Sequence, residues 1–232
     1  MALRVKYRFL LLDADGTLFD FLRCEHDALI DALADFGVTA DEEMVKSYSR
    51  INDRLWKMLE RGEIRKNVLR EERFRRFAVE YGFSLDIPAL SAAYTDHLSA
   101  KNFLVPGALP VCRTLAGKYK LYIVTNGLKT VQERRLDASP LCPFFSGRFI
   151  SEEMGAEKPS PAFFAAVDAR IPDFSPEKAL IIGDSLSSDM KGGVAAGIDT
   201  CWYNPAGLPT PKDMNITYTI GRLEELLPLL GL

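Results

Sequence analysis

Long hydrophobic runs are the first thing that this 232-residue sequence lacks. No stretch approaches the roughly 18 apolar residues that a membrane span needs. The opening apolar run at residues 9–12 is too short for the core of a signal peptide, and it leads directly into an aspartate. We therefore expect no membrane partner and a cytoplasmic location.

Paired cysteines are also missing. The four cysteines, Cys24, Cys112, Cys142 and Cys201, are scattered and form no C-x-x-C motif. This spacing disfavours both a zinc site and a disulfide framework, so we expect reduced, structural cysteines.

The sequence has no excess of charge of one sign. Its 29 basic and 32 acidic residues give a formal charge of -3, and they are spread along the chain. Binding to a polyanion needs a concentrated basic face, so this distribution argues against a nucleic acid polymer or an anionic membrane as partner.

What the sequence does contain is a series of short apolar runs separated by helical stretches. Runs of this kind are typical of parallel strands that are buried on both faces. They predict an α/β fold, a Rossmann-like doubly wound parallel sheet. The candidate strands are residues 9–12, 121–124, 179–182 and 200–203, with a weaker candidate at 148–150.

The segment from 21 to 101 lacks convincing strands and shows helical periodicity instead. Four apolar stripes lie within residues 28–36, 44–59, 69–81 and 90–98, and a glycine follows each of the first three. We interpret residues 21–101 as an inserted helical cap domain, and residues 1–20 and 102–232 as the α/β core. A cap inserted after the first strand would sit where ligands of open sheets bind.

Two aspartates, Asp13 and Asp15, follow the first candidate strand within D-A-D-G-T. Neighbouring carboxylates repel one another unless a cation lies between them or one is protonated. The pair therefore predicts a metal site, an acid/base pair, or both. An EF-hand is rejected because the glycine and glutamate that this loop requires are missing. A surface turn with two solvated aspartates is the alternative, although it would follow a run that should be buried.

The second candidate strand ends in Thr125, Asn126 and Gly127, whose hydroxyl, amide and backbone N–H groups could bind phosphate oxygens. An ordinary turn would explain this tripeptide equally well.

Two more carboxylates, Asp184 and Asp189, follow the strand at 179–182. Oxygen ligands from several strand ends suit a hard cation, above all Mg²⁺. Lys158, which precedes a proline, could neutralise both the acidic cluster and a phosphate, although most lysines are simply solvated.

In order and spacing, these motifs resemble the haloacid dehalogenase superfamily of phosphohydrolases. The resemblance comprises D-x-D-G-T at residues 13–17, the strand-end Thr125, Lys158 and G-D-x-x-x-x-D at residues 183–189. It covers essentially the whole chain, and it implies that the helical insert is a mobile cap.

The resemblance also implies catalytic roles. Asp13 would be the nucleophile that forms an aspartyl-phosphate, and Asp15 would be the general acid and base. Thr125, Asn126 and Gly127 would hold the phosphoryl oxygens, and Lys158 would neutralise charge on the nucleophile and the phosphate.

The same resemblance implies a magnesium site. The ligands would be the carboxylates of Asp13 and Asp184 and the carbonyl of Asp15, with Asp189 supporting them.

Asp15 separates the branches of this superfamily. The dehalogenases resemble D-x-Y at this motif and have no acid at its third position, because a halide leaves without a proton. Asp15 therefore favours hydrolysis of a phosphate ester. Cleavage of a phosphonate would need a cap lysine, and we expect Lys46, Lys57 and Lys66 to lie outside any apolar setting that would lower a lysine pKa.

Within the superfamily, the chain is similar to bacterial pyrimidine 5′-nucleotidases that act on noncanonical nucleoside monophosphates. The shared features are the aromatic residues Phe19 and Phe21, I-N-x-x-L-W at residues 51–56 and E-E-x-G-x-x-K-P at residues 152–159. Phe19, Asn52 and Trp56 are candidate contacts with the base, although core packing or solvation would also explain each of them.

This resemblance predicts a small phosphate ester as substrate, Mg²⁺ as cofactor and a monomer or homodimer. Three alternatives stay open: a phosphoglycolate or sugar-phosphate phosphatase, a phosphomutase, and a protein that binds phosphate without catalysis.

Overall fold

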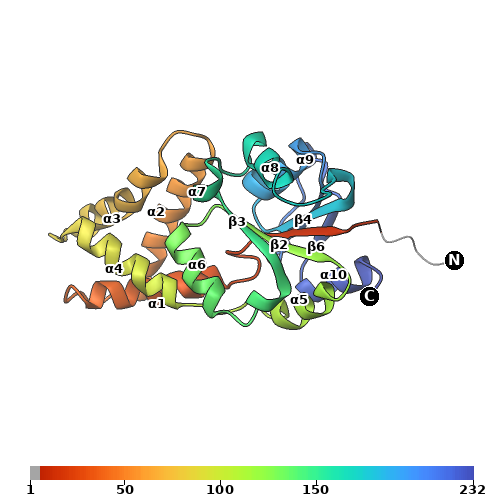
Figure 1. Ribbon diagram of the computed structural model, residues 1–232. Helices are drawn as coiled ribbons and strands as arrows, with labels where there is room; N and C mark the ends of the chain where they lie inside the picture. The colour runs from red at the N-terminus through yellow and green to blue at the C-terminus, as the bar shows by residue number, and fades with distance from the viewer. Residues whose placement is uncertain (1–5) are drawn as a thin grey trace. The chain divides into compact units, whose positions relative to one another are not determined.

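The computed structural model describes residues 6–232, which form two compact units. The first unit is the core, in which a six-stranded sheet has the order β3-β2-β1-β4-β5-β6 and all neighbouring strands are parallel (Figure 1). The strands are β1 (Phe9–Leu12), β2 (Lys120–Thr125), β3 (Phe145–Ile150), β4 (Ala179–Gly183), β5 (Asp199–Tyr203) and β6 (Tyr218–Ile220).

Helices cover both faces of this sheet. Side chains of β1 alternate between the faces: Leu10 and Leu12 belong to one hydrophobic cluster, and Phe9 and Leu11 to the other. Helices α5 and α10 lie on the first face, and α8 and α9 lie on the second (Figure 1). The core helices are α5 (Ala108–Ala116), α6 (Lys129–Ala138), α7 (Ser151–Met154), α8 (Pro161–Asp168), α9 (Lys191–Ala195) and α10 (Leu226–Leu229).

The sheet order creates a topological switch point beside β1. From β1 the sheet continues through β2 on one side and through β4 on the other. In open parallel sheets of this order, ligands bind beyond the carboxyl ends of the strands at this point. The segments that follow β1, β2 and β4 therefore contain the residues to examine for function.

The second unit, residues 21–103, consists of four helices. These are α1 (Phe21–Ala34), α2 (Glu42–Glu60), α3 (Lys66–Tyr81) and α4 (Ile87–Ala100). Asp41 begins α2 by accepting a hydrogen bond from the Met44 N–H, and Gly82 ends α3 in a left-handed conformation. Helix α1 packs against α4, and α2 against α3.

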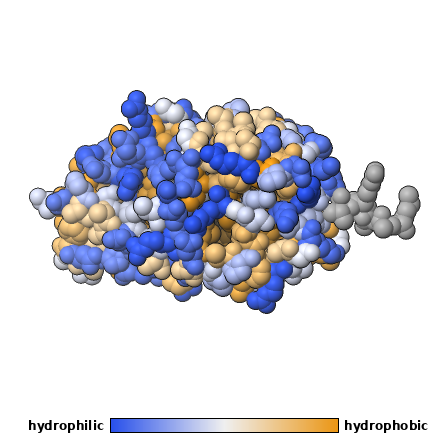
Figure 2. Space-filling view, in the orientation of Figure 1, coloured by the Kyte–Doolittle hydropathy of each residue, from blue (hydrophilic) through white to orange (hydrophobic). Residues whose placement is uncertain are grey.

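Aromatic side chains form much of the core of this unit. Tyr48 contacts Phe74, Phe77 and Tyr94 with ring centroids 5.2 to 5.8 Å apart. The outer faces of the helices have many charged residues, and the side of the unit drawn in Figure 2 is largely hydrophilic. The apolar stripes of the sequence are thus the packing surfaces of a separate helical unit.

The structure confirms the predicted Rossmann-like fold with its helical cap. Every candidate strand is present, and β3 begins three residues before the predicted 148–150. Strand β6 escaped prediction because three residues are too few to show a pattern. The second domain boundary follows Phe103, whereas the sequence interpretation drew it after residue 101; residues 1–5 of the predicted core segment lie outside the described part.

None of the four cysteines forms a disulfide, and three of them are buried. None of the helices within residues 6–232 combines the length and apolar character needed to cross a membrane.

Candidate active site

Three adjacent strands of the core end at the same level. Leu12 at the end of β1 pairs with Ile123 of β2 and with Ile182 of β4. The backbone N–H of Asp13 donates to the Ile182 carbonyl over 2.9 Å, which extends the ladder to the first aspartate. The polar residues that follow these strands are therefore brought together by the register of the sheet.

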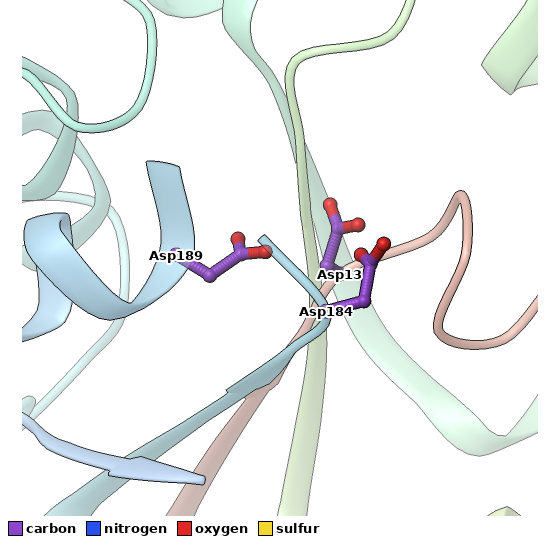
Figure 3. A group of neighbouring side chains, drawn as sticks. All are labelled: Asp13, Asp184 and Asp189. Atoms are coloured by element: carbon purple, nitrogen blue, oxygen red, sulfur yellow. The ribbon is translucent and has the colours of Figure 1, made fainter. Parts of the chain in front are cut away.

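Three carboxylates form an acidic cluster at this edge. Oxygen atoms of Asp13, Asp184 and Asp189 all lie within 4.8 Å of one another. Asp13 and Asp184 lie side by side after β1 and β4, and Asp189 points toward them from the helical turn beyond β4 (Figure 3). The structure thus brings together three of the four aspartates that the sequence assigned to a metal.

Lys158 binds two members of this cluster. Its Nζ donates to Asp13 Oδ1 and to Asp189 Oδ1, each over 2.6 Å, and to the Val124 carbonyl over 2.7 Å. The side chain is 2% exposed. Helix α8 begins only at Pro161, so Lys158 lies in the turn before it, which the Ser160 N–H closes by donating to the Glu157 carbonyl over 2.8 Å.

Burial and charge oppose each other in this cluster. Burial raises the pKa of Asp13 well above its usual range, although Lys158 partly offsets the rise. Burial alone would lower the pKa of Lys158, but the carboxylates of Asp13 and Asp189 outweigh it and hold that pKa above its usual range. The lysine is therefore an ammonium group.

Asp184 is the most open member of the cluster, because its residue is exposed while the other two aspartates are buried. Protein atoms around its carboxyl group displace water and, together with Asp189, raise its pKa to about 7. Thr17 Oγ1 donates to Asp184 Oδ1 over 3.3 Å, and Trp202 Nε1 donates to the Asp184 carbonyl over 2.9 Å.

This donor set fits a divalent cation. Three carboxyl groups lie around one ammonium group in a poorly hydrated place, and the raised pKa values of Asp13 and Asp184 show that their ionised forms lack sufficient positive charge. Oxygen-only ligands suit Mg²⁺, and a cation beside Asp13 would favour its ionised form.

Thr125, Asn126 and Gly127 form the turn after β2. Both polar atoms of the Asn126 amide bind the backbone of Lys158 over 2.8 Å, and the Gly127 N–H donates to Thr125 Oγ1 over 3.0 Å. The Asn126 side chain, which the sequence offered to phosphate, is therefore engaged in holding Lys158.

Asp15 lies apart from the acidic cluster and is held by α6. Gln132 Nε2 donates to Asp15 Oδ2 over 2.5 Å, and Arg135 Nη1 donates to Asp15 Oδ1 over 2.6 Å. Gly16, with a φ of 82°, turns the chain directly after Asp15.

Sequence reasoning missed Gln132 and Arg135, as well as Thr17 and Trp202. The signal for the first two was a Gln and an Arg three apart on the helix that follows the T-N-G turn, a spacing that aligns side chains on one face. A charged residue in an amphipathic helix ordinarily indicates an exposed face, so the pattern by itself does not reveal burial.

The structure places the three candidate base contacts differently. Phe19 is fully buried in the hydrophobic core of the first unit, which leaves no ring face for a nucleobase. Asn52 is 2% exposed inside the helical unit and donates to Glu25 over 2.7 Å. Trp56 alone of the three is partly exposed.

Lys66 differs from Lys46 and Lys57, which are exposed. Lys66 is buried, and its Nζ lies 5.9 Å from the centroid of the Trp56 ring, so its setting is partly apolar. The long aliphatic stem of a lysine lets such a side chain pack along an aromatic surface.

Comparison with known proteins adds sequence relationships to this geometry. The family model described as haloacid dehalogenase-like hydrolase matches residues 7–197. The HAD-hydrolase YfnB of Bacillus subtilis is 40% identical over 98% of this chain and 97% of its own. A crystal structure of YfnB bound to magnesium superimposes with a TM-score of 0.94 over 98% of this chain and all of the other.

Two further relatives are named pyrimidine 5′-nucleotidases. PynA of Streptococcus pneumoniae is 38% identical over 97% of this chain and 95% of its own. YjjG of Escherichia coli is 32% identical over 97% of this chain and 99% of its own. The chain belongs to the haloacid dehalogenase-like hydrolase family and is a phosphatase of that family.

Proposed function

We propose that this phosphatase is a Mg²⁺-dependent 5′-nucleotidase that hydrolyses pyrimidine nucleoside monophosphates through an aspartyl-phosphate on Asp13. The main support for the proposal is the pair of carboxylates Asp13 and Asp15 after β1. Their surroundings differ, as expected if one is the nucleophile and the other exchanges protons. Asp13 hydrogen-bonds an ammonium group, whereas Asp15 is bound by α6 and keeps 24% of its side chain exposed.

In the first step, Asp13 attacks phosphorus and the bond from phosphorus to the ester oxygen breaks. The leaving alkoxide takes a proton from Asp15, and the products are the nucleoside and a phosphorylated Asp13. Lys158 fixes the Asp13 carboxylate through Oδ1 and contributes positive charge beside the reacting phosphoryl group.

In the second step, water attacks the aspartyl-phosphate. Asp15, which has lost its proton, accepts one from the water; the bond between phosphorus and Asp13 breaks, and inorganic phosphate leaves. Both aspartates return to their starting forms. Thr125 and the backbone of the turn after β2 are the groups proposed to hold phosphoryl oxygens.

Asp13 and Asp184, with the carbonyl of Asp15, are the proposed ligands of Mg²⁺, and Asp189 supports them. When bound, Mg²⁺ would stabilise negative charge on the phosphoryl oxygens. Lys158 stays between Asp13 and Asp189 and limits the repulsion among the carboxylates.

The substrate class rests on the two relatives named pyrimidine 5′-nucleotidases, whose similarity covers nearly the full length of this chain, helical unit included. Trp56 is the one of the three candidate base contacts that is partly exposed.

A panel of phosphate esters with Mg²⁺ tests the proposal by release of inorganic phosphate. The panel contains pyrimidine and purine nucleoside 5′-monophosphates, phosphoglycolate, sugar phosphates and p-nitrophenyl phosphate. We expect the highest kcat/KM for pyrimidine nucleotides. A preference for sugar phosphates or phosphoglycolate would overturn the substrate class. A requirement for a bisphosphate activator would indicate a mutase, and no turnover of any ester would indicate a binding protein.

A further inference from the structure

Helix α6 directs two buried polar side chains at Asp15. Gln132 and Arg135 are 1% and 0% exposed, and each donates to a different carboxylate oxygen, over 2.5 and 2.6 Å. Because both oxygens have a donor on the same helix, rotation of the Asp15 carboxyl group would break at least one strong hydrogen bond.

Stability alone is a weak explanation for this arrangement. A buried ion pair often contributes no more than well-packed apolar residues of similar volume would. Arg135 is among the largest fully buried side chains of the described residues, and its guanidinium lies 4.4 Å from the centroid of the Phe19 ring. The ring limits the directions in which Arg135 can point and so fixes the donor that reaches Asp15.

The amide of Gln132 supports the same conclusion. Its Nε2 binds Asp15, while its Oε1 is buried without a hydrogen-bond partner among the described residues. A buried carbonyl without a hydrogen-bond partner is unfavourable. The opposite orientation would set Oε1 against a carboxylate oxygen, so the contact with Asp15 determines how the amide lies.

Gln132 also contacts the turn after β2. A Cβ atom at Gly127 would collide with Gln132 Nε2, so only a residue without a side chain leaves room for the amide there. The same side chain thus touches the turn proposed to hold phosphate and the carboxylate proposed to move protons. This contact links the positions of the two groups.

We propose that Gln132 and Arg135 are positioning residues that aim the Asp15 carboxyl group at the ester oxygen and then at the attacking water. This inference rests on the proposed function, in which Asp15 exchanges those protons. Loss of either donor lets the carboxyl group turn away, and a misplacement of about 1 Å can cost about 10²-fold in rate.

The test compares two esters that differ in their need for a proton. The alkoxide of a nucleoside monophosphate needs one when it leaves, whereas p-nitrophenolate is stable without one. The variants are Gln132→Met and Arg135→Met, which keep most of the side-chain volume, and Arg135→Lys, which keeps charge. Arg134→Met is the matched control, because it changes the exposed neighbour on the same helix.

We expect single-turnover cleavage of the nucleotide to slow by about 10- to 100-fold in the two Met variants, with KM within about threefold of the parent. Release of p-nitrophenolate in the first turnover should stay within about twofold. Because dephosphorylation also needs Asp15, that release should appear as a burst of about one equivalent followed by slow turnover. Arg135→Lys should recover part of the rate, and Arg134→Met should match the parent.

Equal slowing of the first turnover for both esters would overturn the inference, and so would unchanged kcat in a folded Gln132→Met variant. Circular dichroism and Tm identify variants that fail to fold. If Arg135→Met is one of them, the kinetics of Gln132→Met and Arg135→Lys test the inference. Asp15→Asn separates the two claims. If it lacks the dependence on the leaving group, the proposed role of Asp15 fails; if it has the dependence and the α6 variants lack it, only the positioning role fails.

Discussion

Both units bury a polar cluster, and the two clusters differ in their balance of charge. In the core, Asp13, Asp184 and Asp189 share one ammonium group, that of Lys158. In the helical unit, Glu25 accepts hydrogen bonds from Asn52 and Ser49 over 2.7 and 2.5 Å, and the Arg73 guanidinium lies close enough to favour its ionised form.

The difference supports the proposed catalytic role of the core cluster. Glu25, Asn52 and Arg73 lie within helices and offset one another's burial by charge and hydrogen bonds, although Arg73 Nη2 is buried without a hydrogen-bond partner among the described residues. The core aspartates follow strand ends, outnumber the one ammonium group beside them and include the exposed Asp184. Both units therefore bury charged groups. Among the described residues, the cluster in which carboxyl groups outnumber cations at an open sheet edge is that of the core.

The largest expected effect is that of Asp13→Asn. The amide keeps the volume and can still accept a hydrogen bond from Lys158, but it cannot form the acyl-phosphate. We expect kcat for a nucleoside monophosphate to fall by at least about 10³-fold, with Tm unchanged or raised because a buried negative charge is removed. Turnover within tenfold of the parent would refute Asp13 as the nucleophile.

Replacing the basic side chain of each cluster, Lys158 in the core and Arg73 in the helical unit, should give the next largest effects. Lys158→Met should lower kcat by about 10²–10³-fold, because it removes positive charge beside the nucleophile. Arg73→Met should lower the free energy of unfolding by about 3 kcal/mol, because it leaves Glu25 less compensated. In variants that are still folded at the assay temperature, kcat should be near that of the parent.

Urea denaturation and steady-state kinetics on the same samples check both values. Arg76→Met, on the exposed side of α3, is the control for loss of an arginine. If Arg73→Met lowers kcat in the folded state as much as Lys158→Met does, the distinction between a structural and a catalytic cluster is lost.

Mg²⁺ should distinguish the clusters by stability. A ligand at 100 times its Kd stabilises the folded state by about 2.7 kcal/mol, so saturating Mg²⁺ should raise Tm by several degrees. Asp184→Asn should abolish most of that rise, whereas Asn52→Ala should leave it unchanged although the unliganded protein is destabilised. Differential scanning fluorimetry with and without Mg²⁺ measures the shift, and an equal rise in the parent and in Asp184→Asn would exclude the proposed ligand.

The sequence located several residues that the structure brings together at the edge of the core sheet, because they follow recognisable strands. Asp13, Thr125 and Asp184 each come directly at or after an apolar run, and parallel strands bring such ends to one edge. Lys158 was a candidate to neutralise the acidic cluster, but the sequence alone could not distinguish this role from that of a solvated loop lysine. The family resemblance added its role beside the nucleophile Asp13.

The cap residues were harder to interpret, since helical periodicity gives the buried face but not the partner of a polar side chain on it. Asn52 and Arg73 lie 21 residues apart on different helices, and only tertiary packing brings them together. Gln132 and Arg135 escaped prediction for the same reason. The cytoplasmic location and the monomeric or homodimeric state stay predictions.

The smallest expected effect is a change in the pH dependence of stability from Glu25→Gln. Burial raises the pKa of Glu25 above its ordinary value of 4.5, although Ser49, Asn52 and Arg73 oppose the rise. Between the unfolded and folded pKa values the folded state binds more protons, so stability falls as pH rises through that window.

Glutamine has no carboxyl proton to lose, so the Glu25→Gln variant should lack this fall. Its stability relative to the parent should therefore increase with pH, by about 1 kcal/mol, a usual size for one substitution. Urea titrations from pH 4 to pH 8 (about four values suffice) measure it. A difference between parent and variant that is constant with pH would mean that the pKa of Glu25 is the same in the folded and unfolded states, which would contradict the prediction.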